Sequence, residues 1–360
     1  MEFSERVKSL TAYGLVPKVV DNVLGGNPVS YRVIGNAKSG NAKGYSVVKA
    51  VKVTNSSTAS SFAGLDTFSA SPLDTKIRME FQMHGLRQPV ALSGMEMVAN
   101  MPSEAKVTDM IKESLEETQQ ELTDYIGDLL YGDGTGNSDK DFTGLGAIVD
   151  DGTDVSTIGG QSRSTYPVLN ATRTASGGTL SLAKMATLHS AISDGTPNTT
   201  PTLLVANDTV WNLFETLWLP TVSQTQSISL APSVVGLKGG LQREQGLKGQ
   251  VGFTALAYKG IPFVADPKAT SQTLYMLNEK QLEWYGWDAM GVAGYKKVSL
   301  GSETIEGVYS EAPGQFSGFS WSGLMTPTNQ FGVVGVIQLL GELTSFAPKR
   351  HGRLTGITAV

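Results

Sequence analysis

The pattern of apolar and polar residues changes its period several times along the chain, and each change marks a new predicted element. In the first 26 residues the apolar side chains come at irregular intervals and two glycines close the segment, so we predict a short arm. From residue 29 the period is two, with Val29, Tyr31 and Val33 alternating with polar residues, and it resumes between residues 45 and 53. A period of two is typical of a strand with one buried face.

A second alternating stretch, residues 76–84, follows a segment rich in Ser, Thr, Ala and Gly at residues 54–75. The two stretches predict an extended hairpin over residues 28–93 with a polar tip. A two-stranded ribbon cannot cover both of its faces and is marginally stable alone, so we expect another molecule to cover it. The side chains that we expect to make such contacts are apolar residues of the hairpin and the arm: Phe62, Leu65, Phe68, Ile77, Met79, Phe81, Met83, Val19 and Val23.

The clearest element is a helix over residues 103–131, where apolar residues recur every three or four positions and glutamates and glutamines fill the rest. At about 1.5 Å per residue it would be roughly 43 Å long, which is more than most helices of compact domains reach. A glycine-rich turn at residues 132–136 ends it. We therefore predict a long spine to which other elements attach.

The second half of the chain alternates helical and strand patterns. Ser181 is a predicted N-cap for a helix over residues 181–194, and Asn207 caps another helix directly after a buried strand at residues 202–206. We predict a loop at residues 221–252 and short strands near residues 260–264, 274–277 and 282–285. Long apolar strands at residues 331–340 and 343–346 would return to the spine helix.

Composition narrows the range of functions. The chain has 360 residues, 40% of them hydrophobic, so it can bury a core; its net charge of -5 does not favour a dedicated nucleic-acid binder. It has no cysteine, which excludes disulfides and thiolate chemistry. The uncharged stretch 312–341 is interrupted by prolines, and its apolar part is shorter than the roughly 20 residues of a membrane span. We expect neither a membrane segment nor a secretory signal.

A search for catalytic patterns finds little. The three histidines, at positions 84, 189 and 351, are isolated in sequence, and we interpret them as surface or locally hydrogen-bonded groups. No nucleotide-binding loop or zinc spacing occurs. Asp133, Asp139 and Asp141 are weak candidates for a metal site, but aspartates among glycines more often form turns. We therefore expect no catalytic residue, no cofactor and no metal, and keep a carboxylate-dependent hydrolase only as an alternative.

The order of these elements resembles that of the HK97-fold major capsid proteins of tailed bacteriophages over almost the whole chain. The sharpest local likenesses are the segments YGDGTG at residues 131–136, LLVANDTVW at 203–211 and KGIPFV at 259–264. The resemblance implies an α+β fold with five parts. These are an N-terminal arm (1–27), an E-loop hairpin (28–93), a P-domain with the spine helix (94–194), an A-domain (195–325) and C-terminal strands that return to the P-domain (326–360).

The resemblance also implies a function. A chain of this kind is not an enzyme; it assembles with itself, as hexamers and pentamers, into the icosahedral head of a virion. The shell would form in the cytoplasm of a bacterial host with a separate scaffolding protein, a portal and possible decoration proteins. It would enclose double-stranded DNA without sequence-specific binding and without a membrane. Residues 54–75 contain no lysine, so we do not expect the covalent crosslink of some family members. An encapsulin-like cargo compartment, or a tail or decoration protein, are the alternatives.

Overall fold

A computed structural model describes residues 29–30, 32–33, 40–41, 44–54, 61, 63–66, 74–100, 104–195, 198–222, 256–286, 296–297, 319–322, 324–328 and 330–359. The predicted arm with Val19 and Val23, the hairpin residues Phe62 and Phe68, and nearly all of the predicted loop 221–252 lie outside these residues. Of the helices in the described ranges, none is both long enough and apolar enough to span a bilayer.

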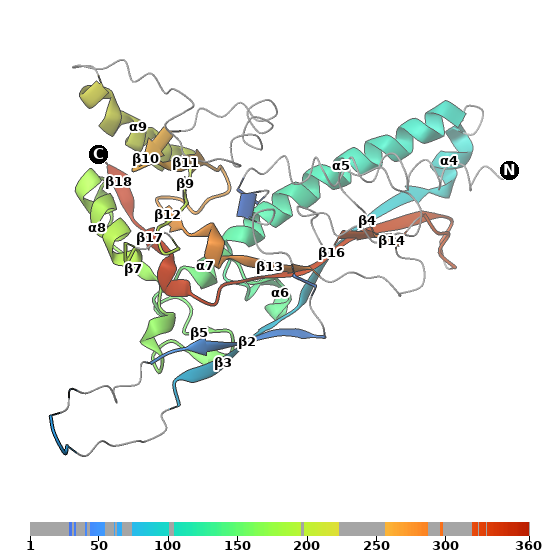
Figure 1. The fold of residues 1–360 in the computed structure, drawn as a ribbon. Coiled ribbons are helices and arrows are strands. Elements are labelled where there is room, and N and C mark those ends of the chain that lie inside the picture. The colour runs from blue at the N-terminus through green and yellow to red at the C-terminus, as the bar shows by residue number, and fades with distance from the viewer. Residues whose placement is uncertain are drawn as a thin grey trace.

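A long helix and a six-stranded sheet built around strand β16 (Gly332–Thr344) form one half of the molecule, and the longest pairing in that sheet is the ladder of β16 with β4 (His84–Ser93). Helix α5 (Glu104–Tyr131) confirms the predicted spine, and it lies along β4, which pairs with β16 from Ser93↔Gly332 to His84↔Gly341 (Figure 1). Leu86, Val90 and Leu92 of β4 share one core with apolar residues of α5, among them Ile111, Leu122 and Ile126. The apolar face of the helix, which repeats every 3.6 residues, packs in this core against the apolar face of the strand, which repeats every two residues.

The C-terminal apolar segments form one strand, where the sequence predicted two. The sequence predicts a gap between the strands at Gly341 and Glu342, but both residues continue the pairing, here with β13 (Glu283–Gly286). The Trp284 ring occupies the space above Gly341, so close that a Cβ atom there would lie 2.2 Å from it. The buried Glu342 carboxylate is matched by His84. The strand therefore persists because both residues have specific partners.

The other half of the molecule is a six-stranded sheet with two helices on one face (Figure 1). Strand β9 lies near its centre, and its side chains alternate between two cores: Leu203 and Val205 pack toward the spine, whereas Leu204 and Ala206 pack toward the two helices. Strands from three of the predicted parts of the chain share this sheet. Its order is β10 (Leu256–Tyr258), β11 (Ile261–Ala265), β9 (Leu203–Ala206), β12 (Leu274–Leu277), β17 (Gly352–Leu354) and β7 (Thr172–Thr174), with helices α8 (Leu182–Ile192) and α9 (Asp208–Val222).

Both predicted helix caps are confirmed. The Ser181 hydroxyl accepts a hydrogen bond from the backbone N–H of Lys184 (3.3 Å), and the Asn207 side chain accepts one from the N–H of Val210 (3.1 Å). Leu182, the first residue of α8, is apolar but exposed.

Short elements complete the described part of the chain. They are β1 (Gly40–Asn41), α4 (Gly94–Asn100), α6 (Gly136–Asp139), α7 (Leu145–Ile148), β5 (Thr157–Ile158), β6 (Gln161–Ser162), β8 (Gly178–Thr179), β14 (Lys296–Lys297), β15 (Phe319–Trp321), β18 (Ile357–Ala359) and the 3-10 helices η2 (Pro167–Leu169), η3 (Glu279–Gln281) and η4 (Pro348–Arg350).

The strand predicted at residues 29–33 is wrong. Residues 29–30 and 32–33 are helical, and the side chains of Val29 and Val33 are both buried in the core. Residues four apart lie on the same face of a helix, so the same sequence satisfies a helical pattern as well as an alternating one. Arg32 fixes the turn to the body through a hydrogen bond from its Nε to Glu279 Oε1 (2.7 Å).

Candidate assembly surface

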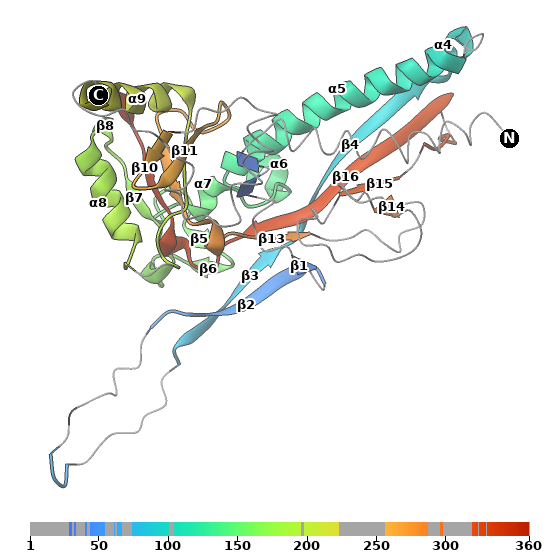
Figure 2. The ribbon, with the colours of Figure 1, turned by 45° about the horizontal axis from the view of Figure 1, so that its top comes forward.

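The hairpin predicted from the sequence is present and extends from the body. Strands β2 (Ser46–Lys52) and β3 (Lys76–Gln82) pair antiparallel from Ser46↔Gln82 to Lys52↔Lys76 (Figure 2). One further backbone hydrogen bond at each end, from Val53 to Thr75 (2.9 Å) and from Met83 to Tyr45 (3.0 Å), lengthens the ribbon. Residues 84–93, which the sequence assigned to the same hairpin, instead form β4 and pair with β16.

One face of the hairpin is covered by the chain's own body. Met79 is fully buried and Phe81 almost so, with the ring of Phe81 edge-on to that of Phe346 at 5.4 Å. The backbone N–H of Glu80 donates to the carbonyl oxygen of Gly159 (2.9 Å), which anchors β3 to the turn between β5 and β6. The expectation that Met79 and Phe81 contact a neighbouring molecule is therefore wrong, because they already belong to this core.

The remaining predicted contacts are more accessible. Ile77 and Met83 are half-buried, and Leu65, at the tip, is fully exposed at 102%. The tip turns at Gly64, whose φ of +62° suits glycine, and the Asp66 carboxylate accepts a hydrogen bond from the N–H of Ala63 (2.8 Å). The tip thus presents a large apolar side chain on a tight polar turn.

The opposite face of the hairpin carries Val48, Ala50, Lys52, Lys76 and Arg78, all exposed. Lys52 and Lys76 are directly opposite each other in the strand register. The Arg78 guanidinium forms a salt bridge with Glu80 on its own strand (2.8 Å). This face, which we call the outer face, is basic with small apolar patches.

Polar contacts fix the hairpin to β13. The Lys49 ammonium lies 3.1 Å from Glu283 Oε1 and 4.6 Å from the centre of the Phe346 ring. The Tyr285 hydroxyl donates to Glu283 Oε2 (2.8 Å), and burial together with this bond raises the pKa of Tyr285 to about 12. The hairpin base is therefore held by charge as well as by apolar packing.

The junction between β3 and β4 has its own ion pair. His84 Nδ1 donates to Glu342 Oε2 (2.7 Å), and the N–H of Thr143 donates to the other carboxylate oxygen (3.1 Å). The hydrogen bond to Glu342 raises the pKa of His84, and burial raises the pKa of Glu342. Each of the two side chains therefore keeps its proton to a higher pH than it would in an unfolded chain. The pair lies where strand β3 of the hairpin leads into β4.

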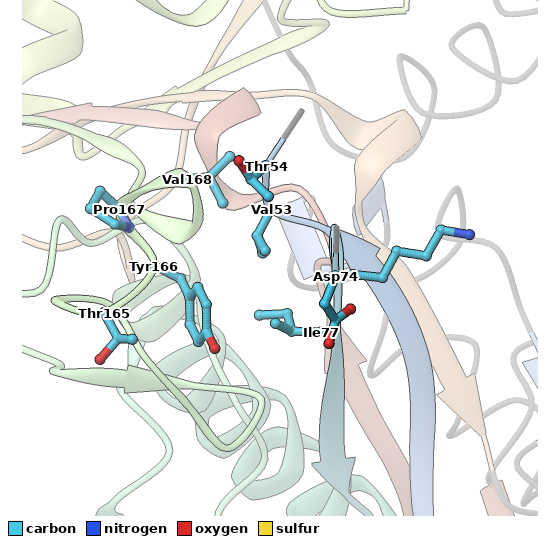
Figure 3. A pocket seen from close by; sticks show the side chains of 9 residues that line it. Val53, Thr54, Asp74, Ile77, Thr165, Tyr166, Pro167 and Val168 are labelled. Atoms are coloured by element: carbon cyan, nitrogen blue, oxygen red, sulfur yellow. The ribbon is translucent and has the colours of Figure 1, made fainter. Parts of the chain in front are cut away.

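A hollow of about 360 Å³ separates the outer part of the hairpin from the body (Figure 3). Val53 and Ile77 line it from the hairpin, and Tyr166 and Val168 line it from the body. The Asp74 carboxyl is part of the same lining. The ribbon is therefore packed on the body at its base and separates from it further out.

A second accessible apolar region, which the sequence did not predict, lies at the far end of the β4–β16 ladder. Met95, Val98, Met325 and Phe331 are between 51% and 73% exposed. Phe331 precedes β16 and lies against Gly94, where a Cβ atom would come within 2.5 Å of its ring. The sequence predicts a strand that begins at Phe331, but the strand begins one residue later.

The aspartates considered as metal ligands do not come together. The Asp133 carboxylate accepts hydrogen bonds from the backbone N–H (3.0 Å) and hydroxyl (2.8 Å) of Thr135, and these bonds lower the pKa of Asp133. Asp141 accepts from the Tyr125 hydroxyl (3.2 Å), and Asp139 lies in a turn with a φ of +58°. In the described part of the chain, no three His, Cys, Asp or Glu side chains are grouped as metal ligands would be. Asp133 stabilises the turn after α5 through its hydrogen bonds to Thr135, as aspartates in turns usually do.

Asp150, in the loop after α7, is a fully buried acidic residue. Its Oδ2 accepts from the N–H groups of Gly152 (2.9 Å) and Val155 (3.0 Å), and its Oδ1 is bound by Arg353 of β17. Nearby, Arg163 donates to backbone carbonyls, including that of Leu169 (2.8 Å), and burial lowers its pKa to about 10. The cluster joins the C-terminal strand to the loop after α7.

His351 is also fully buried. Its Nδ1 accepts from the N–H of Asn278 (3.2 Å), so the neutral ring carries its proton on Nε2, which faces the Ser345 hydroxyl at 3.1 Å. Burial lowers the pKa of His351 to about 3. His189 is half-buried on α8, and its pKa is also lowered by burial. Of the three histidines, only His84 has an acidic partner in the described structure.

Comparison with known proteins identifies the fold. No protein-family profile and no curated sequence matches the chain. Among solved structures, it is similar to the capsid asymmetric unit of cyanophage A-1(L), with a TM-score of 0.64 and 14% identity over 92% of this chain and 93% of the other. The chain has the HK97-type fold. The capsid of Myoviridae phage XM1 (TM-score 0.50, 14% identity, 89% and 90% covered) shares it. So does the encapsulin SrpI of Synechococcus elongatus PCC 7942 (TM-score 0.50, 9% identity, 91% and 87% covered).

The HK97-type fold confirms the predicted α+β class over nearly the whole length of the chain. Its two projections, the hairpin and the far end of the spine, expose large apolar side chains, among them Leu65 and Phe331.

Proposed function

We propose that the chain is the major capsid protein of a tailed bacteriophage and that many copies form the icosahedral shell of its head. The observation that carries the proposal is a fold shared with the cyanophage A-1(L) capsid at a TM-score of 0.64. The extended hairpin supports it, because its outer face and its tip expose apolar and charged side chains with no cover in the described monomer.

The proposed mechanism is association through many weak, repeated contacts. Leu65, Ile77 and Met83 would contribute to these contacts from the described part of the hairpin. We expect Phe62, Phe68, Val19 and Val23 to contribute as well. Contacts between different surfaces of identical subunits generate rings, so pentamers and hexamers can form from one chain and together close a shell. Each contact can be weak because many act together.

Further partners follow from the same proposal. A separate scaffolding protein, a portal and decoration proteins would act with the shell, which would enclose double-stranded DNA without reading its sequence. The net charge of -5 favours weak contact between the shell and the DNA, since a protein that bound phosphate tightly would hinder release of the genome. The chain would be part of the virion, and we expect no catalytic activity.

Deleting the hairpin tip tests the function. Replacing residues 53–75 with a two-residue Asn-Gly turn keeps the pairing of Lys52 with Lys76. It should leave a folded subunit, because Met79 and Phe81 stay in the core, but should abolish particles. Particles are counted by electron microscopy after sedimentation, and circular dichroism checks the fold. Substituting a Gly/Ser segment of the same length for residues 54–75 separates the loss of side chains from the loss of length. Normal particles from both variants would refute a role for the tip.

The second candidate is an encapsulin-like compartment, favoured by the likeness to SrpI at a TM-score of 0.50. The genes beside this one discriminate between the two. Portal and tail genes would support the phage head, whereas a lone enzyme gene would support a cargo compartment. A tail or decoration protein would form rings or trimers and no closed particles.

A further inference from the structure

Methionine is the only source of sulfur in this chain, which has eleven methionines and no cysteine. Peroxides oxidise a methionine thioether to a sulfoxide, and the change turns a flexible apolar side chain into a polar one. In a folded protein the reaction is fast only where the oxidant can reach the sulfur. The exposure of each methionine therefore decides where an oxidant of this class acts.

The described methionines differ widely in exposure. Met95 and Met325 are 73% and 51% exposed. Three others have 0% of their surface exposed: Met79, Met185 and Met276. Another three are half-buried: Met83, Met97 and Met110. Among the methionines that the structure describes, the most accessible thioethers are therefore those of Met95 and Met325.

The two exposed methionines lie in the same apolar region, although they are far apart in the sequence. Met95 is in the first turn of α4, and the N–H of the preceding Gly94 donates to the carbonyl oxygen of Phe331 (3.0 Å), directly before β16. Met325 exchanges backbone hydrogen bonds with Val334 of β16 in both directions (2.9 and 2.8 Å). Both methionines thus lie beside the start of β16. The exposed apolar residues at this place form what we call the far-end patch: Met95, Val98, Met325 and Phe331.

Sulfoxides in the far-end patch would change the surface and leave the core intact. The hydrophobic core beneath the patch is formed by other residues, among them Leu324 and the partly buried Met97, and it includes neither Met95 nor Met325. At Met79, by contrast, a sulfoxide would place a polar S=O group among buried apolar side chains, which lowers stability unless a hydrogen bond satisfies it.

We propose that, of the methionines in the described part of the chain, Met95 and Met325 react first with hydroperoxides, and that the reaction converts the far-end patch from an apolar into a polar surface while the fold is kept. In each reaction the sulfur gives an electron pair to one peroxide oxygen, an S–O bond forms and the O–O bond breaks. The proton on the transferred oxygen passes to the hydroxide that leaves, so hydrogen peroxide is reduced to water as the thioether is oxidised. The reaction needs only the folded subunit, whether or not copies of it form a shell.

Peptide mapping measures where the oxygen is added. The full chain, as unassembled folded subunits, is treated with hydrogen peroxide, the reaction is stopped at intervals with free methionine, and fragment mass spectra give the oxidised fraction at each position. Met95 and Met325 should be oxidised about tenfold faster than Met79, Met185 and Met276, because peroxide reaches a buried sulfur only when the fold opens. In urea the rates should become similar. Similar rates in the folded chain would overturn the proposal.

Hydrophobic-interaction chromatography measures the change of surface. After brief peroxide treatment the natural chain should elute earlier than the untreated chain. A Met95→Leu, Met325→Leu double variant should lose most of this shift, since leucine keeps the patch apolar and takes up no oxygen. The matched control, Met83→Leu with Met110→Leu, changes two half-buried methionines and should shift as the natural chain does. Equal shifts in the natural chain and the Met95 and Met325 variant would show that the change of surface lies elsewhere and would refute the assignment.

Urea unfolding separates a change of surface from a loss of the fold. The natural chain should unfold at the same urea concentration before and after the brief treatment, because no core residue has changed. A lower midpoint in the treated natural chain that is absent from the treated Met95 and Met325 variant would show that these sulfoxides disturb the core. That result would contradict the proposal.

Discussion

Acid should destabilise the subunit through His351, which lies between the ends of β16 and β17. Burial lowers the pKa of this side chain to about 3, whereas a histidine in an unfolded chain titrates near 6.5. The folded state therefore excludes a proton that the unfolded state binds. The stability associated with the neutral ring is fully present above pH 6.5 and is lost as the pH falls toward 3.

The magnitude follows from the pKa difference. Each pH unit below about 6.5 removes roughly 1.4 kcal/mol of unfolding free energy, so about 3 kcal/mol is lost at pH 4 from this group alone. His351→Gln keeps an amide that can bond to Asn278 or Ser345, and it binds no proton. The variant should be about 1–3 kcal/mol less stable at pH 7, since one buried hydrogen bond is weakened.

Urea unfolding of unassembled subunits, monitored by tryptophan fluorescence at several pH values, measures both the stability of the variant at pH 7 and the loss of stability in acid. The difference in unfolding free energy between the natural chain and His351→Gln should shrink or reverse between pH 7 and pH 4. His189→Gln is the matched control, because His189 is only half-buried and should leave the slope nearly unchanged. Identical pH slopes for the natural chain and His351→Gln would refute the reasoning.

Two further predictions concern buried charges. Both members of the His84–Glu342 pair have raised pKa values, so their contribution is complete below about pH 4.5 and falls as the pH rises through 6.5 and above. In the same urea series, His84→Gln should be about 1.5–3 kcal/mol less stable at pH 6 and should lose the part of the decline between pH 6 and 8 that His84 causes. Arg353→Met leaves the buried Asp150 carboxylate without its main cation and should lower the unfolding free energy by about 3 kcal/mol at pH 7. A loss under about 1 kcal/mol would show that the backbone donors and Arg173, 3.9 Å away, are enough to satisfy Asp150.

The elements that the sequence predicts correctly are those whose signals are local. Helix α5 has a sustained apolar period and a glycine-rich stop, and α9 begins with a capping asparagine after a buried strand. The residues that form these signals lie within a few positions of each other. No knowledge of the rest of the fold is needed to interpret them.

The parts that were missed depend on contacts distant in sequence. The pattern around Val29 and Val33 fits the period of a helix as well as that of a strand. The segment is helical because both side chains are buried in the core. Alternation showed that Met79 and Phe81 share a face, but it could not show that Phe346 of the same chain covers that face. Asp150 is followed by turn-forming residues, and its partner Arg353 is 203 positions away.

The β4–β16 ladder has a mechanical consequence. Its backbone hydrogen bonds run perpendicular to the strands over ten paired positions, and β16 continues past them to β13 in the body. A pull along the strands loads all of these bonds in shear at once, whereas a pull across them would open the bonds one after another. A subunit stretched along its spine should therefore resist rupture much better than one peeled from its edge.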